Sequence, residues 1–310
     1  MNSKSLFWLL TTVLLITVSI AESQQPTKIP RVGYLATISL SIIPARIEAF
    51  RQGLRELGYV EGKNIVIEWR SAEGKPARVP GLATELVRLK VDIIVTAGSP
   101  ATRAAKEATV TIPIVMSQVG DPVGSAFVDS LAHPGGNITG LSTLAPELNG
   151  KRLELLKEII PRLSRVAVFA TSTQTDNALL LRDVNLAAKA FGVKLQYLDV
   201  LDPKDIETAF RDAVKGRAEG ALWMAVGVGG HRTLVTELAV KSRLPVIYSN
   251  SLYVDAGGLM FYGVNFADLD RRAAVYVDKI LKGRTPRDLP VEQPMKFEFI
   301  INLKAAKAIG

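Results

Sequence analysis

Apolar and polar positions follow two patterns that alternate along most of this chain. Short apolar runs such as 31–36 and 65–69 are typical of buried strands. Between them, apolar residues recur every three or four positions, as in 43–57 and 79–89, which is typical of amphipathic helices. Strand and helix continue to alternate through 91–141. This alternation predicts a parallel sheet that is covered by helices on both faces.

The same alternation starts again after Leu141, with expected strands at 166–170, 195–198, 221–226 and 246–248. The chain is therefore predicted to be an α/β protein with two Rossmann-like, doubly wound lobes of parallel sheet. The segment after Leu259 is too short for a third domain, so it must pack on the existing lobes. We expect a first lobe from 28–142 plus 260–292 and a second lobe from 143–259 plus 293–310, with three crossovers near Ser142, Leu259 and Pro294.

The stretch 91–124 contains two polar turns that each follow an apolar strand. Gly98-Ser99-Pro100 and Gly120-Asp121-Pro122 place a hydroxyl or a carboxylate at an N-cap position and proline at the first helical position. Two helix N-termini are therefore expected at one edge of the sheet, where their unpaired N–H groups suit an anionic part of a ligand. The alternative is that Ser99 and Asp121 only cap their helices.

Polar side chains also gather at the other predicted strand ends. Hydroxyl and amide groups there can bind a carboxylate, whereas Asp121 or Asp176 can accept from an ammonium group, and an amino acid carries both groups. Tyr253 is a candidate wall for an apolar side chain. The candidate ligand contacts are Thr37, Ser99, Pro100, Ala101, Gln118, Asp121, Thr173, Asp176, Asn177, Asn250 and Tyr253.

The N-terminus has the pattern of a secretory signal peptide. Lys4 precedes the apolar run 6–20, and Ser19-Ile20-Ala21 is a small-residue cleavage sequence, so we expect residues 1–21 to be removed after Ala21. A membrane anchor is the alternative interpretation, but threonine and serine interrupt a run that is already shorter than the ~20 apolar residues of a span.

Composition excludes several classes of function. The 310 residues include no cysteine, which excludes disulfides, thiol catalysis, zinc–thiolate sites and a lipid-modified cysteine. The net charge of +8 is scattered without interleaved aromatic residues, so no nucleic-acid partner is predicted. His133 and His231 lack a metal spacing, and HExxH, GxSxG and a lysine-bearing phosphate loop do not occur. The sequence therefore predicts no metal, no cofactor and no enzymatic centre.

Four stretches together carry a resemblance to a known family: LGYVEGKNIVIEWRSAEG, GSPAT, GDPVGSAFVDSLAHPGGNITGLS and the segment from Asp270 to Gly310. With them the chain resembles the ABC-transporter substrate-binding family that includes tryptophan- and tyrosine-uptake binding proteins. The match covers essentially all of the mature chain, and DPVG followed by PGGN-x-TG is its most specific part.

This resemblance implies a type I periplasmic-binding fold that holds a small solute between its lobes and delivers it to an ABC permease in the membrane. By analogy, the contacts would be Thr37, Ser99 and Asp121 in the first lobe and Asn177 and Asn250 in the second. We expect a periplasmic or otherwise extracytoplasmic monomer that binds a carboxylated ligand, with an aromatic or branched amino acid as the leading candidate. The alternatives are a sensor that presents its ligand to a membrane receptor and an exported α/β enzyme.

Overall fold

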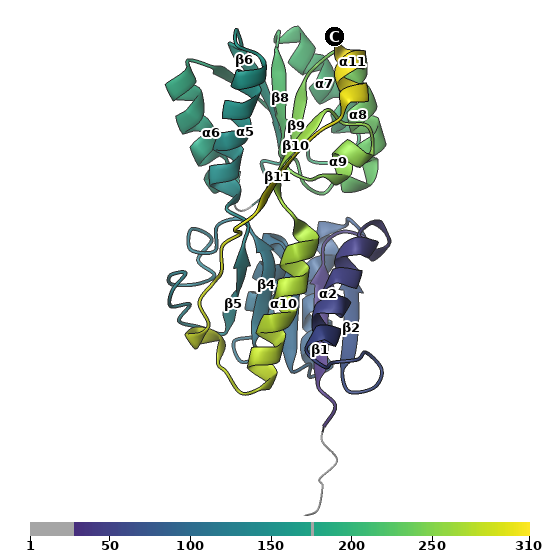
Figure 1. Cartoon of the computed structure of the whole chain (residues 1–310), viewed down its shortest axis with the longest axis vertical. Coiled ribbons are helices and arrows are strands. Elements are labelled where there is room, and N and C mark those ends of the chain that lie inside the picture. Colours follow the sequence, from purple (N-terminus) through teal and green to yellow (C-terminus); the bar gives the residue numbers. More distant parts are fainter. Residues whose placement is uncertain (1–27, 175–176) are drawn as a thin grey trace, which may run out of the picture.

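The computed structural model describes residues 28–174 and 177–310 and has two lobes, one above the other in Figure 1. The predicted signal peptide and Asp176 lie outside the described residues. Each lobe is a β-sheet with helices on both faces, which confirms the predicted fold class. Within the described ranges, no helix combines the length and the hydropathy that a membrane span requires.

The first lobe is built on a fully parallel sheet whose strand order is β2-β1-β3-β4-β5. Its strands are β1 (Arg31–Ala36), β2 (Val66–Ser71), β3 (Ile93–Ala97), β4 (Ile114–Val119) and β5 (Ile138–Ser142). Both β3 and β5 are buried along their whole length, as expected for parallel strands that are covered on both faces.

Helices α2 (Pro44–Glu56) and α10 (Phe266–Leu281) cover one face of this sheet, and Figure 1 shows them side by side although they are far apart in sequence. Helices α3 (Val79–Arg88) and α4 (Ser99–Ala108) cover the other face. Short 3-10 turns complete the lobe at η2 (Leu40–Ile42), η3 (Pro76–Arg78) and η5 (Pro286–Asp288). Because α10 supplies Leu269 and Ala273 to the core of the first lobe, this lobe needs a segment that follows most of the second.

The strands of the second sheet lie in the order β7-β6-β8-β9-β10, which repeats the topology of the first sheet. The antiparallel strand β11 pairs with β10 and extends the edge of the sheet. Its strands are β6 (Arg165–Ala170), β7 (Lys194–Asp199), β8 (Gly220–Trp223), β9 (Val246–Tyr248), β10 (Met260–Val264) and β11 (Phe297–Ile301). Helices α7 and α8 cover one face, and α5, α6 and α11 cover the other. The helices and turns are α5 (Ala145–Ile159), α6 (Asn177–Phe191), α7 (Asp205–Lys215), η4 (Gly229–His231), α8 (Arg232–Lys241), α9 (Leu252–Asp255) and α11 (Leu303–Ile309).

The chain crosses between the lobes at 143–144, at Asn265 and at 293–296. The expected crossing near Leu259 is therefore displaced, because β10 pairs with β9 and belongs to the second sheet rather than to the first lobe. The third crossing lies beside the first, since Glu292 forms a bridge with Leu141 and its carbonyl accepts from the Ser142 N–H at 2.9 Å.

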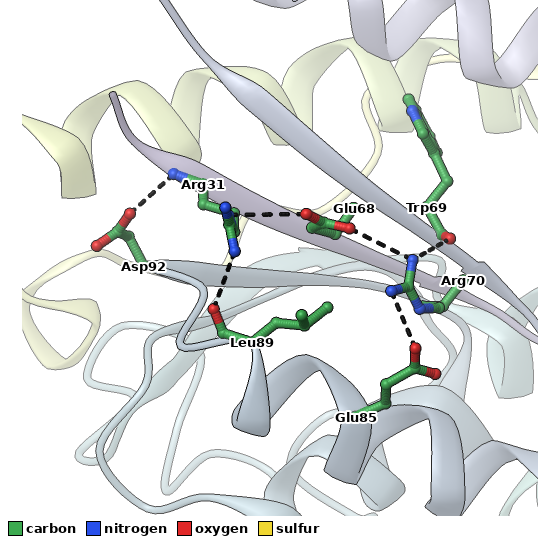
Figure 2. A network of polar contacts seen from close by, with 7 residues as sticks. All are labelled: Arg31, Glu68, Trp69, Arg70, Glu85, Leu89 and Asp92. Atoms are coloured by element: carbon green, nitrogen blue, oxygen red, sulfur yellow. Dashed lines mark hydrogen bonds and ion pairs between the residues drawn. The ribbon is translucent and has the colours of Figure 1, made fainter. Parts of the chain in front are cut away.

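Charged residues on β1 and β2 and beside β3 of the first sheet pair with one another, as Figure 2 shows. Asp92 accepts from the backbone N–H of Arg31 at 2.8 Å, and Glu68 lies between the guanidinium groups of Arg31 and Arg70 at 3.7 and 3.5 Å. Arg70 also pairs with Glu85 at 3.0 Å. Such half-exposed pairs contribute little to stability. Arg31 and Asp92 stand where β1 and β3 begin, whereas Arg70 lies one residue before the end of β2, so the network runs along the sheet from its start towards the carboxyl ends of the strands.

Candidate functional site

A cavity of about 300 Å³ lies between the lobes, where the carboxyl ends of both sheets meet. In a sheet with this strand order, ligands bind where the order reverses, which is between β1 and β3 in the first lobe and between β6 and β8 in the second. Residues 37–38 and 97–100 line the cavity from the first lobe, and Gln174 and 224–227 line it from the second. Both reversal points therefore face one shared cavity.

The start of α4 forms part of the first-lobe wall. Gly98 is the N-cap residue, with φ 96°, and no side chain caps the helix. Glycine adopts this left-handed geometry without strain. Ser99 is thus the first helical residue rather than the N-cap, and its hydroxyl is not used for capping. This geometry does not support the alternative in which Ser99 only caps α4.

The second polar turn differs from its prediction, because no helix follows Gly120-Asp121-Pro122. The Asp121 carboxylate accepts from the Gly124 N–H at 2.8 Å, and Ala126 has φ 55°. The positive φ of Ala126 is incompatible with a right-handed helix, and Phe127, which follows it, is buried in the core. The expected second helix N-terminus is therefore wrong.

A buried carboxylate organises the polar part of the first-lobe wall. Asp270 is 0% exposed and accepts hydrogen bonds from the Tyr34 hydroxyl at 2.9 Å and from Arg46 Nε and Gln118 Nε2 at 2.8 Å each. Burial raises the pKa of Tyr34, and the neighbouring Asp270 raises it further. Burial opposes the charge on Arg46, but Asp270 and Tyr34 leave its pKa raised overall. Arg46 therefore keeps its charge, and its hydrogen bond to Asp270 holds it against the cavity.

The second-lobe wall contains an arginine that has no acidic partner among the residues that the structure describes. Arg152 is 4% exposed, and it donates from Nε to the Tyr262 carbonyl at 2.7 Å and from Nη1 to Asn149 Oδ1. Burial lowers the pKa of Arg152 to about 9, which leaves the guanidinium protonated at neutral pH. Arg232 also lines the cavity and donates to the Gly229 carbonyl at 2.6 Å.

Aromatic rings back the second-lobe wall. Tyr253 is 5% exposed and stacks on Tyr248 with ring centroids 4.9 Å apart and an interplanar angle of 5°. Its hydroxyl accepts from Trp223 Nε1 at 3.0 Å, and burial raises the pKa of Tyr253 to about 12. Because the ring is fixed on two sides, it offers a rigid surface to the cavity.

The structure brings six of the residues expected from sequence to the cavity wall: Thr37, Ser99, Pro100, Gln118, Asn250 and Tyr253. Four others are not among the residues that line it: Ala101, Asp121, Thr173 and Asn177. Ala101 is buried inside the first lobe, Thr173 is exposed, the Asp121 carboxylate lies 4.0 Å from Arg182, and Asn177 is the first residue of α6. Asp176 is outside the described residues.

Sequence reasoning missed the arginines and Asp270, although a signal was present. Arg46 lies on the same helical face as Ile43, Ile47 and Phe50, and all four are buried. Arg152 likewise falls four residues from both Leu148 and Leu156 on the buried face of α5. A charged residue on the apolar face of an amphipathic helix must have a buried partner or a polar site, and this pattern could have identified both.

Metal binding has no support in the described ranges, where no group of three histidine or acidic side chains is placed to hold an ion. The fold and its shared cavity instead define a bilobed solute-binding protein of type I periplasmic-binding architecture. Residues 32–310 match the model of the family described as ABC transporter substrate binding protein. The chain belongs to this family, as the sequence resemblance implied.

Similar proteins agree with this assignment. The tyrosine-binding protein of Clostridioides difficile is 27% identical over 264 residues, which cover 84% of this chain and 75% of the relative. A conserved domain protein from Vibrio cholerae has a TM-score of 0.85 and 29% identity, with 91% of this chain and 95% of that chain covered. An ABC domain in complex with L-Trp from Streptococcus pneumoniae has a TM-score of 0.83 and 23% identity, with 90% and 94% covered. The first of these relatives is named for binding tyrosine, and the third was solved with L-Trp bound.

Proposed function

We propose that this chain captures a small carboxylated ligand in the cavity between its lobes and delivers it to an ABC permease for import. The observation that carries the proposal is that both strand-order reversals open on one cavity, whose walls combine apolar side chains with the Ser99 hydroxyl and three arginines. Such a mixture suits a ligand with one apolar end and one anionic end.

The first ligands to test are aromatic and branched amino acids. The Tyr253 ring and Phe266 line the cavity, and the two relatives named for tyrosine and L-Trp bind aromatic amino acids. We propose that Thr37, Ser99, Gln118, Asn250 and Tyr253 contact the ligand. Closure would bend the crossovers at 143–144, Asn265 and 293–296.

A thermal-shift screen of amino acids and related carboxylates tests this function. Binding to the native state alone stabilises it by RT ln(1 + [L]/Kd), so a ligand at ~100 Kd adds roughly 2.7 kcal/mol. We expect a carboxylated apolar compound to raise the melting temperature and to be recovered chemically unchanged. Shifts given only by sugars or nucleotides, or turnover of the bound compound, would contradict the proposal.

We further propose that the protein acts outside the cytoplasm as a monomer after cleavage between Ala21 and Glu22. The charge, apolar run and cleavage sequence of residues 1–21 support export. Mass spectrometry of protein recovered from the exported fraction should show an N-terminus at Glu22. Full-length protein retained in the membrane fraction would favour the anchor interpretation.

A further inference from the structure

Arg46 carries a hydrogen-bond donor that no group in the described protein uses. Only 9% of the residue is exposed, and Asp270 binds its Nε, yet Nη2 is buried without a hydrogen-bond partner. The guanidinium stands 5.5 Å from the ring centroid of Phe266, and both residues line the cavity. A buried donor without a partner is unfavourable, so a small shift of the Arg46 side chain that gave Nη2 an acceptor from the cavity would be favourable.

The described walls of the cavity have an unbalanced charge. They contain Arg46, Arg152 and Arg232 and no aspartate or glutamate. Asp270, behind the wall, neutralises only Arg46. Arg152 and Arg232 donate to neutral oxygens, so their charges are not compensated by the contacts they make within the described chain. Arg152 is buried, and a buried cation in this state strongly favours an anion beside it, whereas solvent screens the half-buried Arg232 more.

The two buried arginines approach the same crossover from opposite lobes. Arg152 on α5 bonds to the carbonyl of Tyr262, and Arg46 on α2 lies against Phe266, four residues further along the chain. An anion at the base of the cavity is thereby attracted to both lobes at once. An ammonium group in the same place is repelled by both, since the described lining offers it no carboxylate.

We propose that the cavity recognises net negative charge: Arg46 Nη2 binds the ligand carboxylate, Arg152 attracts it from the opposite lobe, and the preferred ligands are apolar carboxylates that lack an amino group. This inference rests on the proposed function and narrows its ligand class. Ser99 at the start of α4 can donate to the second carboxylate oxygen, while the apolar end of the ligand faces Phe266 and Tyr253.

Calorimetric titration of the mature protein with three compounds of one skeleton tests the proposal. The compounds are 3-phenylpropanoate, phenylalanine, which adds an ammonium group, and 2-phenylethylamine, which lacks the carboxylate. We expect 3-phenylpropanoate to bind at least tenfold more tightly than phenylalanine, and the amine to show no binding. Tighter binding of phenylalanine overturns the inference but leaves the proposed function intact. If none of the three compounds binds, and leucine and 4-methylpentanoate do not bind either, both the inference and the proposed function are overturned.

Two substitutions on one helix locate the anion site. Arg46→Lys keeps a positive charge beside Asp270, but lysine has only one terminal nitrogen and cannot bind Asp270 and the ligand as the guanidinium does. The affinity for 3-phenylpropanoate should therefore fall at least tenfold. The matched control is Arg55→Lys. The Arg55 side chain is 47% exposed and does not line the cavity, so the affinity of this variant for 3-phenylpropanoate should equal that of the unaltered protein. Equal affinities of the two variants would overturn the role of Arg46. The ligand series on the unaltered protein decides the question even where Arg46→Lys does not fold.

Asp176, which lies outside the described residues, provides a further check. The inference is overturned if the unaltered protein prefers phenylalanine to 3-phenylpropanoate and Asp176→Asn abolishes the binding of phenylalanine. Asp176 would then be the acceptor for the ammonium group. A preference for 3-phenylpropanoate that persists in this variant supports the inference, because the selectivity then comes from the arginines.

Discussion

The two walls of the cavity have the same strand topology but different chemistry. In the first lobe, Asp270 fixes Arg46 and Gln118 through charge-assisted hydrogen bonds. In the second lobe, a stack of Tyr253 on Tyr248 provides a rigid apolar surface, and within 28–174 and 177–310 Arg152 has no acidic partner. The strand order therefore determines where the site lies, whereas the side chains of each lobe determine what it can bind.

The difference arises from the returning segment of the chain. After the crossing at Asn265, α10 packs against α2, as Figure 1 shows. This packing places Asp270 beside Arg46, whose Nε donates to it at 2.8 Å. The segment that returns to the second lobe forms β11, which pairs with β10, and α11, which packs on the sheet face that α5 also covers. It brings no carboxylate to Arg152.

The largest expected effect is on the first-lobe wall. Asp270→Ala leaves Arg46 buried without its countercharge and removes the acceptor for Tyr34 and Gln118. Breaking a buried pair in this way costs about 3–5 kcal/mol, so the free energy of unfolding measured in urea should fall by this amount. Affinity for the ligand should fall as well, because Arg46 loses the contact that orients it.

The control for this substitution lies on the same helix. Asp268 is 48% exposed and pairs with Arg272 at 3.9 Å, so Asp268→Ala should reduce the unfolding free energy by no more than about 1 kcal/mol. If the two variants were equally stable, Asp270 would not be the group that holds the first-lobe wall, and the contrast between the lobes would be lost.

The second-lobe wall is tested by two tyrosines that stack on each other. Tyr253→Phe removes the acceptor for Trp223 Nε1, which is buried, and should cost about 1–3 kcal/mol. Tyr248 has a buried hydroxyl without a partner, so Tyr248→Phe should be neutral or slightly stabilising. Chemical unfolding of both variants measures the difference. A larger loss for Tyr248→Phe would mean that its hydroxyl has a partner such as bound water.

Much of the fold could be predicted from sequence because nearly every strand is a short apolar run between amphipathic helices. Apolar periodicity predicts the crossing into α10 near Leu259, which is too early, because periodicity does not show which sheet a strand joins. A local signal did exist: Asn265 caps α10 by accepting from the Asp268 N–H, and this marks the end of β10. A cap signature is therefore a better guide to the crossing than the start of an apolar run.

The candidate site was only partly accessible to the same reasoning. Ser99 and Gln118 follow or end strands, and topology alone brings such residues to the cavity. Arg46 and Asp270 are 224 residues apart, so their pairing depends on how α2 packs against α10. Asp121 illustrates the opposite error, because a capping sequence was interpreted as a helix start where the chain forms a turn.

The smallest expected effect concerns Asp121, which faces Arg182 across the two lobes at 4.0 Å. Asp121→Asn keeps the acceptor for the Gly124 N–H and removes only this half-exposed pair, which contributes about 0.2–1 kcal/mol, or at most about a fivefold change in Kd. Arg182→Gln should weaken binding to the same extent, and the double variant should add nothing further, because one interaction is lost in each case. Calorimetry of the three variants with phenylalanine and 3-phenylpropanoate measures these changes in affinity.

A tenfold or larger loss of affinity for phenylalanine in Asp121→Asn, with the affinity of Arg182→Gln unchanged, would instead make Asp121 an ammonium acceptor. The first lobe would then present both signs of charge to the ligand, and the contrast between its wall and that of the second lobe would have to include a zwitterion site.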